Sequence, residues 1–280
     1  FQMKLAFIVQ RYGLEVNGGA EIQCRWTAEH MSKYFEVDVL TTKACDYITW
    51  KNYYPQDEET INGIRVRRFP VARPRHTQRF SRVQERLSRE AHGVGDELRW
   101  LEEEGPFSPS LIAFIKMSES VYDYFVFFSF RYYHSYHGIL AVPRKSILVP
   151  TAEQDPIIPF QIFKELFHRP RAIVYHSAEE RAMIQAVSGN KAIPSDLIGV
   201  GTEIPERYSG DAFRQKYKVG APYIIYLGRI DENKGCSALF DYFRRYKNET
   251  GSEIKLVLAG KTVLSIPAHP DILYLGFIED

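Results

Sequence analysis

The 280 residues suffice for two domains of ordinary size, because globular domains typically contain about 100–200 residues. Hydrophobic residues make up 45% of the chain and charged residues 25%, which is typical of a globular protein. The formal net charge is +1, so the chain as a whole is not biased toward nucleic acids or anionic membranes. No apolar run approaches the roughly 20 residues of a membrane-spanning helix, and no signal peptide is recognisable.

The three cysteines, Cys24, Cys45 and Cys236, lie far apart in the sequence. They form neither a metal-binding spacing nor a C-x-x-C pair, so we expect reduced, structural thiols. Reduced thiols and the absence of a recognisable signal peptide predict a cytoplasmic protein.

Strands and helices alternate along the first two thirds of the chain, which is the pattern of a parallel α/β sheet. Residues 3–9 form an almost continuous apolar run, as expected of a strand covered on both faces. A helix is expected from Asn17, the candidate N-cap, to about Phe35. Gly18 and Gly19 stand at its start, where the backbone can approach a ligand; a tight turn is the alternative. Further strands are expected at residues 37–41, 64–69, 122–128, 146–149 and 172–175.

An Arg-rich stretch begins in the strand expected at residues 64–69 and continues into a helical pattern from about Gln78 to Glu104, which is broken near Gly93 and Gly95. This stretch is either a solvated face, partly neutralised by Glu102–Glu104, or a basic surface for a lipid-diphosphate acceptor, a membrane headgroup or nucleic acid. No nucleic-acid-binding motif accompanies it, so nucleic acid is not an expected partner. Its arginines are Arg65, Arg67, Arg68, Arg73, Arg75, Arg79, Arg82, Arg86 and Arg89.

Polar side chains follow two of the expected strands. Arg131 and His134 come after residues 122–128, and Glu153 and Asp155 come after residues 146–149. Open α/β sheets bind ligands at the carboxyl ends of their strands. Aromatic, histidine and arginine side chains together suit a sugar or a charged acceptor; for His134 the alternative is a hydrogen-bonded structural residue. The two carboxylates are suited to bind acceptor hydroxyls or to exchange a proton; solvated loop residues are the alternative.

The segment around residue 228 has the layout of an anion site. Tyr223–Leu227 predicts a buried strand, Gly228 ends it, and a helix is expected from Lys234. A strand, a glycine-containing loop and a helix direct backbone N–H groups and a helix dipole at an anion. Arg229 and Lys234 add a bidentate fork and a point charge at the same end, which together suit a diphosphate. Solvated loop charges are the alternative.

The string Gly228-Arg229-Ile230-Asp231-Glu232-Asn233-Lys234-Gly235 after a strand resembles the donor-binding loop of the retaining glycosyltransferases of family 4. The resemblance implies a GT-B type α/β fold, with two Rossmann-like parallel-sheet domains of which the second is incomplete here. It also implies that Arg229 and Lys234 hold the diphosphate of a nucleotide sugar and stabilise its departure.

Other segments match the same family. Gly18-Gly19-Ala20-Glu21 resembles a recurrent feature near the donor phosphates and the acceptor. The turn from Ser177 through Glu180, a capping box, and the turn at residues 197–203 match further patterns. The family often has a histidine directly after the strand at 122–128, where this chain has Ser129 and the nearest histidine is His134.

The domain boundaries follow from composition. Residues 199–222 are rich in Pro, Gly and polar residues, which predicts a linker with one small helix at residues 211–217. Phe1 and Gln2 look like the remainder of a cleaved tag, so we begin the first domain at Met3. We therefore expect an acceptor-side domain at residues 3–200, a linker at 201–222 and a partial donor domain at 223–280.

By resemblance, a hexosyl group passes from a nucleotide diphosphate sugar to a hydroxyl of a polysaccharide, lipid or small glycoside, with retention of configuration. No D-x-D motif stands out, so neither a metal nor a cofactor is expected beside the nucleotide sugar. Family members continue with further βα units of the donor domain that carry an E-x7-E motif, which residues 223–280 lack, so this chain alone is expected to have little activity. The alternatives are a non-catalytic acceptor- or nucleotide-binding fragment and a lipid- or nucleic-acid-binding protein. Arg-rich residues 65–89 suggest contact with the inner face of the membrane.

Overall fold

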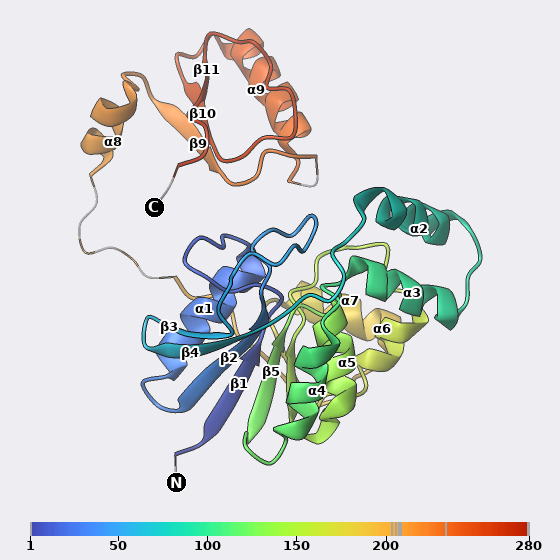
Figure 1. Cartoon of the computed structure of the whole chain (residues 1–280). Helices are drawn as coiled ribbons and strands as arrows, with labels where there is room; N and C mark the ends of the chain where they lie inside the picture. Colours follow the sequence, from blue (N-terminus) through green and yellow to red (C-terminus); the bar gives the residue numbers. More distant parts are fainter. Residues whose placement is uncertain (1, 203, 205, 207–208, 233, 279–280) are drawn as a thin grey trace. The chain divides into compact units, whose positions relative to one another are not determined.

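The computed structural model divides into two compact units, Phe1–Gly201 and Thr202–Asp280, and each has its own parallel sheet (Figure 1). The structure describes residues 2–202, 204, 206, 209–232 and 234–278. Glu203 and Asn233, which we expected in the turn before the linker and in the donor loop, lie outside the described residues.

The first unit is built on an eight-stranded sheet in the order β3-β4-β2-β1-β5-β6-β7-β8. Neighbouring strands are parallel except β3 and β4, which form an antiparallel pair around Asn62 and Gly63. These two residues have φ of 47° and 80°, as a tight hairpin requires. The strands are β1 (Lys4–Ile8), β2 (Glu36–Thr42), β3 (Glu58–Ile61), β4 (Ile64–Phe69), β5 (Tyr124–Phe128), β6 (Ser146–Val149), β7 (Ala172–Tyr175) and β8 (Ser195–Leu197).

Strand β1 is buried on both faces, as its continuous apolar run predicts. Ala6 and Ile8 lie in one hydrophobic core, whereas Leu5, Phe7 and Val9 lie in a second one. Successive side chains of a strand point to opposite faces, so these cores lie on the two sides of the sheet. Strand β1 therefore fixes the centre of the first unit.

Helices cover both faces of this sheet (Figure 1). Helix α1 (Gly19–Met31) contributes Cys24 and Ala28 to one core. The other core contains Trp100, whose ring is edge-on to Phe160 and Phe163. The helices that contribute to the core with Ala6, Ile8 and Trp100 are α2 (Thr77–Arg89), α3 (Val94–Glu104), α4 (Pro109–Met117), α5 (Tyr133–Ala141), α6 (Gln161–Leu166) and α7 (Ala178–Ser188).

The helical pattern from Gln78 to Glu104 forms two helices, α2 and α3, and the break between them lies next to Gly93, as expected. Helix α5 differs from the sequence-based expectation: residues 129–138 were expected as a loop, but the helix begins at Tyr133. A side chain at Gly138 would lie 2.4 Å from the ring of Phe127, so this glycine lets α5 approach β5 closely.

The second unit has a three-stranded parallel sheet in the order β11-β10-β9. Strand β9 (Tyr223–Leu227) forms at the expected residues, but it is not buried: Ile224, Ile225 and Leu227 are 47%, 39% and 69% exposed. One long helix cannot cover both faces of a sheet. The other elements are α8 (Gly210–Tyr217), α9 (Cys236–Thr250), β10 (Lys255–Ala259) and β11 (Ile272–Tyr274).

Across the described residues, no helix has both the length and the apolar character needed to cross a membrane.

Candidate functional site

In the first unit the strand order reverses between β1 and β5, because β2 lies on one side of β1 and β5 on the other. Open α/β sheets form their ligand crevice at the carboxyl ends of the strands at such a reversal. The loop containing Gly18 follows β1, Arg131 follows β5, and Asp155 follows β6. The sheet topology therefore brings the predicted glycine pair and acceptor-side residues to the same edge of the first unit.

Gly18, not Asn17, is the N-cap of α1, and the helix begins at Gly19. A Cβ at Gly18 would lie 2.1 Å from Oε2 of Glu21 and 2.9 Å from Nη2 of Arg11. A Cβ at Gly19 would have no atom within 4 Å. Gly18 is therefore needed for local packing, whereas the backbone at Gly19 is open to approach.

The side chains beneath Gly18 form a buried ion pair. Nη2 of Arg11 lies 2.5 Å from Oε1 of Glu21, and Nε of Arg11 donates a hydrogen bond to the same oxygen at 2.8 Å. Nη1 of Arg11 donates to the carbonyl of Cys45 at 2.8 Å. Arg11 therefore ties the loop after β1 to α1 and to the loop after β2. Arg11 was not predicted as a site residue, and its place after the first strand was its only signal.

Two residues that follow strands at this edge have positive φ although neither is glycine. Ser129, after β5, has a φ of 68°, and Thr151, after β6, has a φ of 47°. The amides of Ser129 and Phe130 donate to the carbonyls of Val149 and Pro150, which extends the pairing beyond the strands. Such backbone costs about 1–3 kcal/mol per residue and is concentrated at functional sites in proteins.

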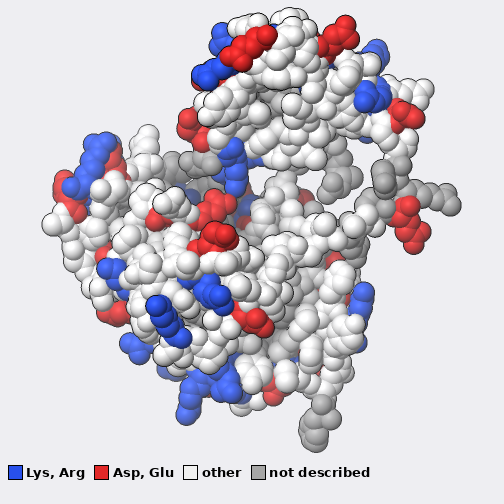
Figure 2. Space-filling view, turned by 180° about the vertical axis from the view of Figure 1, so that it is seen from behind, with Lys and Arg blue, Asp and Glu red and all other residues white. Residues whose placement is uncertain are grey.

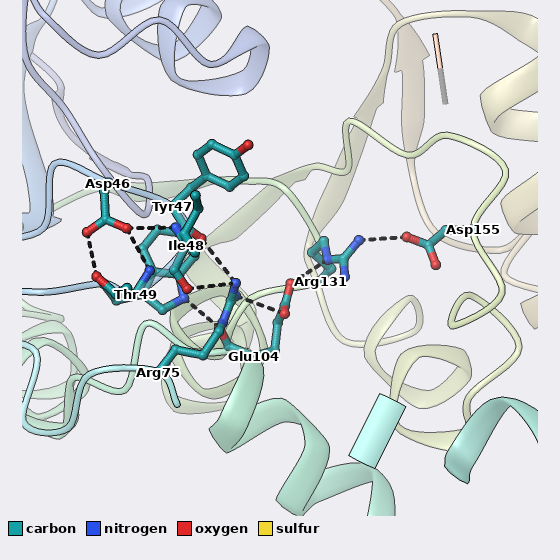
Figure 3. A network of polar contacts seen from close by, with 9 residues as sticks. Asp46, Tyr47, Ile48, Thr49, Arg75, Glu104, Arg131 and Asp155 are labelled. Atoms are coloured by element: carbon teal, nitrogen blue, oxygen red, sulfur yellow. Dashed lines mark hydrogen bonds and ion pairs between the residues drawn. The ribbon is translucent and has the colours of Figure 1, made fainter. Parts of the chain in front are cut away.

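Arg131 and Asp155 lie in one chain of ion pairs (Figure 3). Nε of Arg131 donates to Oε1 of Glu104 at 2.8 Å, and Nη1 donates to Oδ2 of Asp155 at 2.7 Å. Glu104 also accepts a hydrogen bond from Nη2 of Arg75 at 2.9 Å. Burial alone would lower the pKa of Arg131, but the charge and hydrogen bond of Glu104, with the charge of Asp155 and the neighbouring Tyr132, together hold this pKa above its usual value. Arg131 therefore remains a cation in this chain.

Glu104 and Arg75 were not predicted as part of a site. Their only signal was an arginine-rich stretch followed by the acidic run Glu102–Glu104. The side chain of Glu104 is 4% exposed, so it supports Arg131 from within the fold. Arg75 is packed between Trp50 and Phe80, with its guanidinium 5.0 Å and 4.6 Å from the two ring centroids.

His134 was expected either on the acceptor side or as a hydrogen-bonded structural residue, and it is fully buried in α5. Its Nε2 lies 3.3 Å from the carbonyl of Phe128. Burial lowers the pKa of His134 to about 4, so the ring is neutral near pH 7. His134 therefore does not reach the surface where an acceptor would bind, and its contact supports the end of β5.

The loop after β6 carries Glu153, which is exposed, and is anchored by Glu180 of α7. Ser177 caps α7, as predicted, by accepting from the amide of Glu180. The carboxylate of Glu180 does not return to its own N-cap. It accepts from the amides of His176 and Ala152 at 2.7 Å and 2.6 Å. The predicted capping residue thus also fixes the loop that leads to Asp155.

In the second unit, the predicted donor loop connects β9 to α9. Gly235 is the N-cap, with a φ of 70°, so the helix begins at Cys236 and not at Lys234 as expected. The amide of Lys234 donates to Oδ1 of Asp231 at 2.9 Å, and Nε of Arg229 pairs with Oδ2 of the same residue. The charge of Arg229 is therefore partly neutralised inside its own loop, which the sequence analysis did not foresee. Burial, with Cys236 beside it, raises the pKa of Tyr226 to about 12.

Glycines with positive φ end all three strands of the second sheet. Gly228 follows β9, Gly260 follows β10 and Gly276 follows β11 closely, with φ of 145°, 141° and 76°. A Cβ on Gly260 would lie 1.8 Å from the carbonyl oxygen of Gly228, so no other residue fits there. The carboxyl edge of this sheet is thus lined by backbone beside the start of α9. Only Gly228 was singled out from the sequence.

The Arg-rich stretch is largely paired with carboxylates, and on the face seen in Figure 2 basic and acidic side chains are interspersed. This pairing favours a solvated, internally neutralised face over a basic binding surface. The ion pairs are Arg65–Asp38, Arg67–Glu58, Arg68–Glu59, Arg73–Glu103, Arg75–Glu104, Arg79–Glu103, Arg86–Asp96 and Arg89–Glu85.

Within the part of the chain that the structure describes, no group of three or more His, Cys, Asp or Glu residues is arranged to hold a metal ion. No protein-family model and no curated protein sequence matches this chain.

Solved structures do resemble it. HepE of Anabaena, crystallised with UDP-glucose, has a TM-score of 0.63 at 16% identity, covering 99% of this chain and 70% of that chain. An α,α-trehalose-phosphate synthase (UDP-forming) from Burkholderia vietnamiensis has a TM-score of 0.61 at 10% identity, covering 98% and 73%. The N-terminal domain of a trehalose-6-phosphate phosphatase from Candida albicans has a TM-score of 0.59 at 12% identity, covering 98% and 72%.

At these identities the likeness establishes the fold. The eight-stranded and three-stranded sheets form an α/β fold of the GT-B type, which confirms the fold class expected from the sequence.

Proposed function

We propose that this protein is a retaining glycosyltransferase that moves a hexosyl group from a nucleotide diphosphate sugar to an acceptor hydroxyl. The observation that carries the proposal is the loop after β9, where Gly228, Arg229 and Lys234 precede the start of α9. HepE, which shares the fold, was crystallised with UDP-glucose, and the Burkholderia synthase is named UDP-forming. Both names support a nucleotide sugar as the donor.

The chemical demand of such a transfer is to stabilise the charge that develops on the departing diphosphate. The first turn of α9 supplies backbone N–H groups that have no acceptor within the helix, together with the positive end of its dipole. Arg229 and Lys234 add two positive charges at this end. Fixed cations and a helix start meet this demand without a metal ion, and the proposal includes none.

The acceptor is assigned to the carboxyl edge of the first sheet. Arg131 and Asp155 lie there, and Gly19 offers open backbone at the start of α1. A hydroxyl group of a polysaccharide, a lipid-linked sugar or a small glycoside fits this edge, because the side chains present both donors and acceptors of hydrogen bonds.

We test the proposal by removing the two cations separately. In the full-length enzyme, Arg229→Ala and Lys234→Ala should each lower kcat/KM for the nucleotide sugar by an amount equal to about 2–4 kcal/mol of lost transition-state stabilisation, because each removes a group that stabilises the leaving diphosphate. The measurement is donor turnover, as transfer to acceptor or as hydrolysis. Arg244→Ala is the matched control, because it removes an exposed positive charge from the body of α9. Unchanged turnover and nucleotide affinity in both site variants would remove the assignment.

A further inference from the structure

The charged side chains at the carboxyl edge of the first sheet balance one another. Arg11 is matched by Glu21. Arg75 and Arg131 are matched by Glu104 and Asp155, so this chain of two guanidinium and two carboxylate groups has no formal net charge. The edge therefore has many directed polar groups but no excess of positive charge among these pairs.

Of these four ion-paired side chains, only the two at one end are accessible to a ligand. The side chains of Arg75 and Glu104 are 9% and 4% exposed, whereas those of Arg131 and Asp155 are 26% and 24% exposed. A bound molecule would therefore meet a guanidinium and a carboxylate side by side, 2.7 Å apart (Figure 3).

Such a pair distinguishes a hydroxyl from a phosphate. A hydroxyl both donates and accepts, so it can donate to the carboxylate of Asp155 while it accepts from the guanidinium of Arg131. A phosphate only accepts hydrogen bonds when fully ionised, and the negative charge of Asp155 would repel it. To bind Arg131 bidentately, a phosphate would also have to displace a carboxylate that already holds it.

The loops that carry this pair are held in place before any ligand binds. Arg131 lies two residues after Ser129 and Asp155 four residues after Thr151, the two residues with positive φ. Glu180 accepts a hydrogen bond from the amide of Ala152, which holds the second loop. Fixed loops reduce the entropy lost on binding and favour one orientation of the ligand.

We infer that Arg131 and Asp155 form a subsite for the hydroxyls of an uncharged sugar, so that the acceptor enters unphosphorylated at this position. The inference rests on the proposed function for the role of that sugar as acceptor. Glu104 and Arg75 act as positioning residues, because Glu104 holds Arg131, Arg75 holds Glu104, and both side chains are buried.

The test is a ligand-observed NMR titration of the 280-residue chain without nucleotide. The probes are the methyl α-glycosides of glucose, galactose and mannose, the disaccharide maltose, and glucose 6-phosphate. We expect at least one neutral glycoside to bind, and glucose 6-phosphate to bind no more than about twofold tighter than methyl glucoside. The neutral affinity should change by less than about twofold between about 50 mM and about 500 mM salt, because no net charge is recognised. Tighter binding of maltose than of the monosaccharides would indicate an oligosaccharide acceptor, and equal binding would indicate that a single sugar is recognised.

Asp155→Asn gives the sharper result. The amide is similar in size but leaves the charge of Arg131 matched only by Glu104, so binding of the neutral glycoside should fall about tenfold while glucose 6-phosphate binding rises. Glu102→Gln is the matched control: it removes an exposed carboxylate of the same acidic run that is 3.5 Å from Arg73, and it should change neither affinity.

Tighter, salt-dependent binding of glucose 6-phosphate to the unmodified chain would overturn the inference, as would the absence of binding by every neutral probe. An Asp155→Asn variant with unchanged preference would also overturn it. A parallel titration with UDP separates the two proposals, because a chain that binds UDP but no neutral sugar contradicts only this inference. A chain that binds neutral sugars but no nucleoside diphosphate supports the subsite and contradicts the donor assignment.

Discussion

Asp231 makes three contacts inside the loop that carries the two proposed phosphate-binding cations. One carboxylate oxygen pairs with Nε of Arg229, the other accepts from the amide of Lys234, and its carbonyl accepts from the amide of Cys236. These contacts fix the side chain of Arg229 and the path of the backbone into α9. The same carboxylate also offsets part of the positive charge of the loop. Asp231 therefore has two opposite effects on a bound diphosphate: it holds the loop in place, and its negative charge repels the phosphates.

We predict that the ordering of the loop by Asp231 outweighs the repulsion between its carboxylate and the phosphates. Asp231→Ala should weaken the affinity for a nucleoside diphosphate by about tenfold, because one hydrogen bond and one charged tether that hold the loop are lost. Calorimetric titration measures the effect. Glu232→Gln is the control, because it removes a neighbouring negative charge without touching Arg229, and it should leave the affinity unchanged or slightly tighter. A tighter-binding Asp231→Ala variant would show that this carboxylate competes with phosphate.

His134 predicts a pH dependence of stability. Burial lowers its pKa from 6.5 to about 4 in the folded protein, so between these values the unfolded chain binds a proton that the folded protein does not. The stabilisation is complete above about pH 6.5 and is lost as the pH falls toward 4, with a slope of up to about 1.4 kcal/mol per pH unit. Urea unfolding of the protein and of His134→Phe across this range measures the slope. Equal slopes in both proteins would contradict a buried, neutral histidine.

At the scale of the elements, the carboxyl edge of the second sheet depends on close contact between backbone segments. A side chain at Gly260 would collide with the carbonyl of Gly228, and its φ of 141° is unfavourable for any residue with a Cβ. Gly251 ends α9 with a φ of 62° and has open space around it. Gly260 is therefore required both by the lack of space and by its backbone conformation, whereas Gly251 is required only by its backbone conformation.

We predict that Gly260→Ala destabilises the second unit by about 3 kcal/mol or more, whereas Gly251→Ala costs about 1–2 kcal/mol. Amide hydrogen exchange of β10 measures both effects in the whole chain. Similar protection in the two variants would mean that the ends of β9 and β10 do not approach as closely as described.

The elements show which features the sequence could predict. Strands β4, β6, β7 and β9 begin and end at the expected residues, because short apolar or alternating runs define them. Helix α5 was missed because its first buried residues are Tyr133, His134 and Ser135, which have no helical pattern of aliphatic side chains. Helix α9 begins two residues late because the left-handed Gly235 interrupts the pattern.

The sequence predicts part of the candidate site, namely the residues that follow neighbouring strands, but not the residues that support them. Arg131 and Asp155 follow neighbouring parallel strands, so sheet topology alone indicates that they lie close together. The contact of Arg131 with Glu104 joins residues 27 positions apart and depends on how α3 packs, which a pattern of residues does not reveal.

At the scale of the whole molecule, two units with separate cores carry the proposed donor and acceptor functions. The second unit contains a small core that includes Phe240, Phe243 and Leu256, and its strand β9 is largely exposed. Units below about 70–80 residues have marginal cores. The first unit contains all three tryptophans, Trp26, Trp50 and Trp100.

We therefore predict that urea unfolds the second unit first. The loss of helical circular dichroism should begin at a lower urea concentration than the change in tryptophan fluorescence, which reports only the first unit. A nucleoside diphosphate should move the early transition to higher urea, because it binds the folded second unit. Coincident transitions with and without nucleotide would show that the chain unfolds as a single cooperative unit.

The most direct test of the central claim compares nucleoside diphosphates with their monophosphates in calorimetric titrations of this chain. UDP with UMP, ADP with AMP and GDP with GMP differ only in the phosphate that Arg229 and Lys234 are proposed to receive. For at least one nucleoside, we predict that the diphosphate binds about tenfold tighter or more, and that this difference disappears when both residues are changed to alanine. Equal affinities for mono- and diphosphates, or a difference that persists in the double variant, would contradict the proposal.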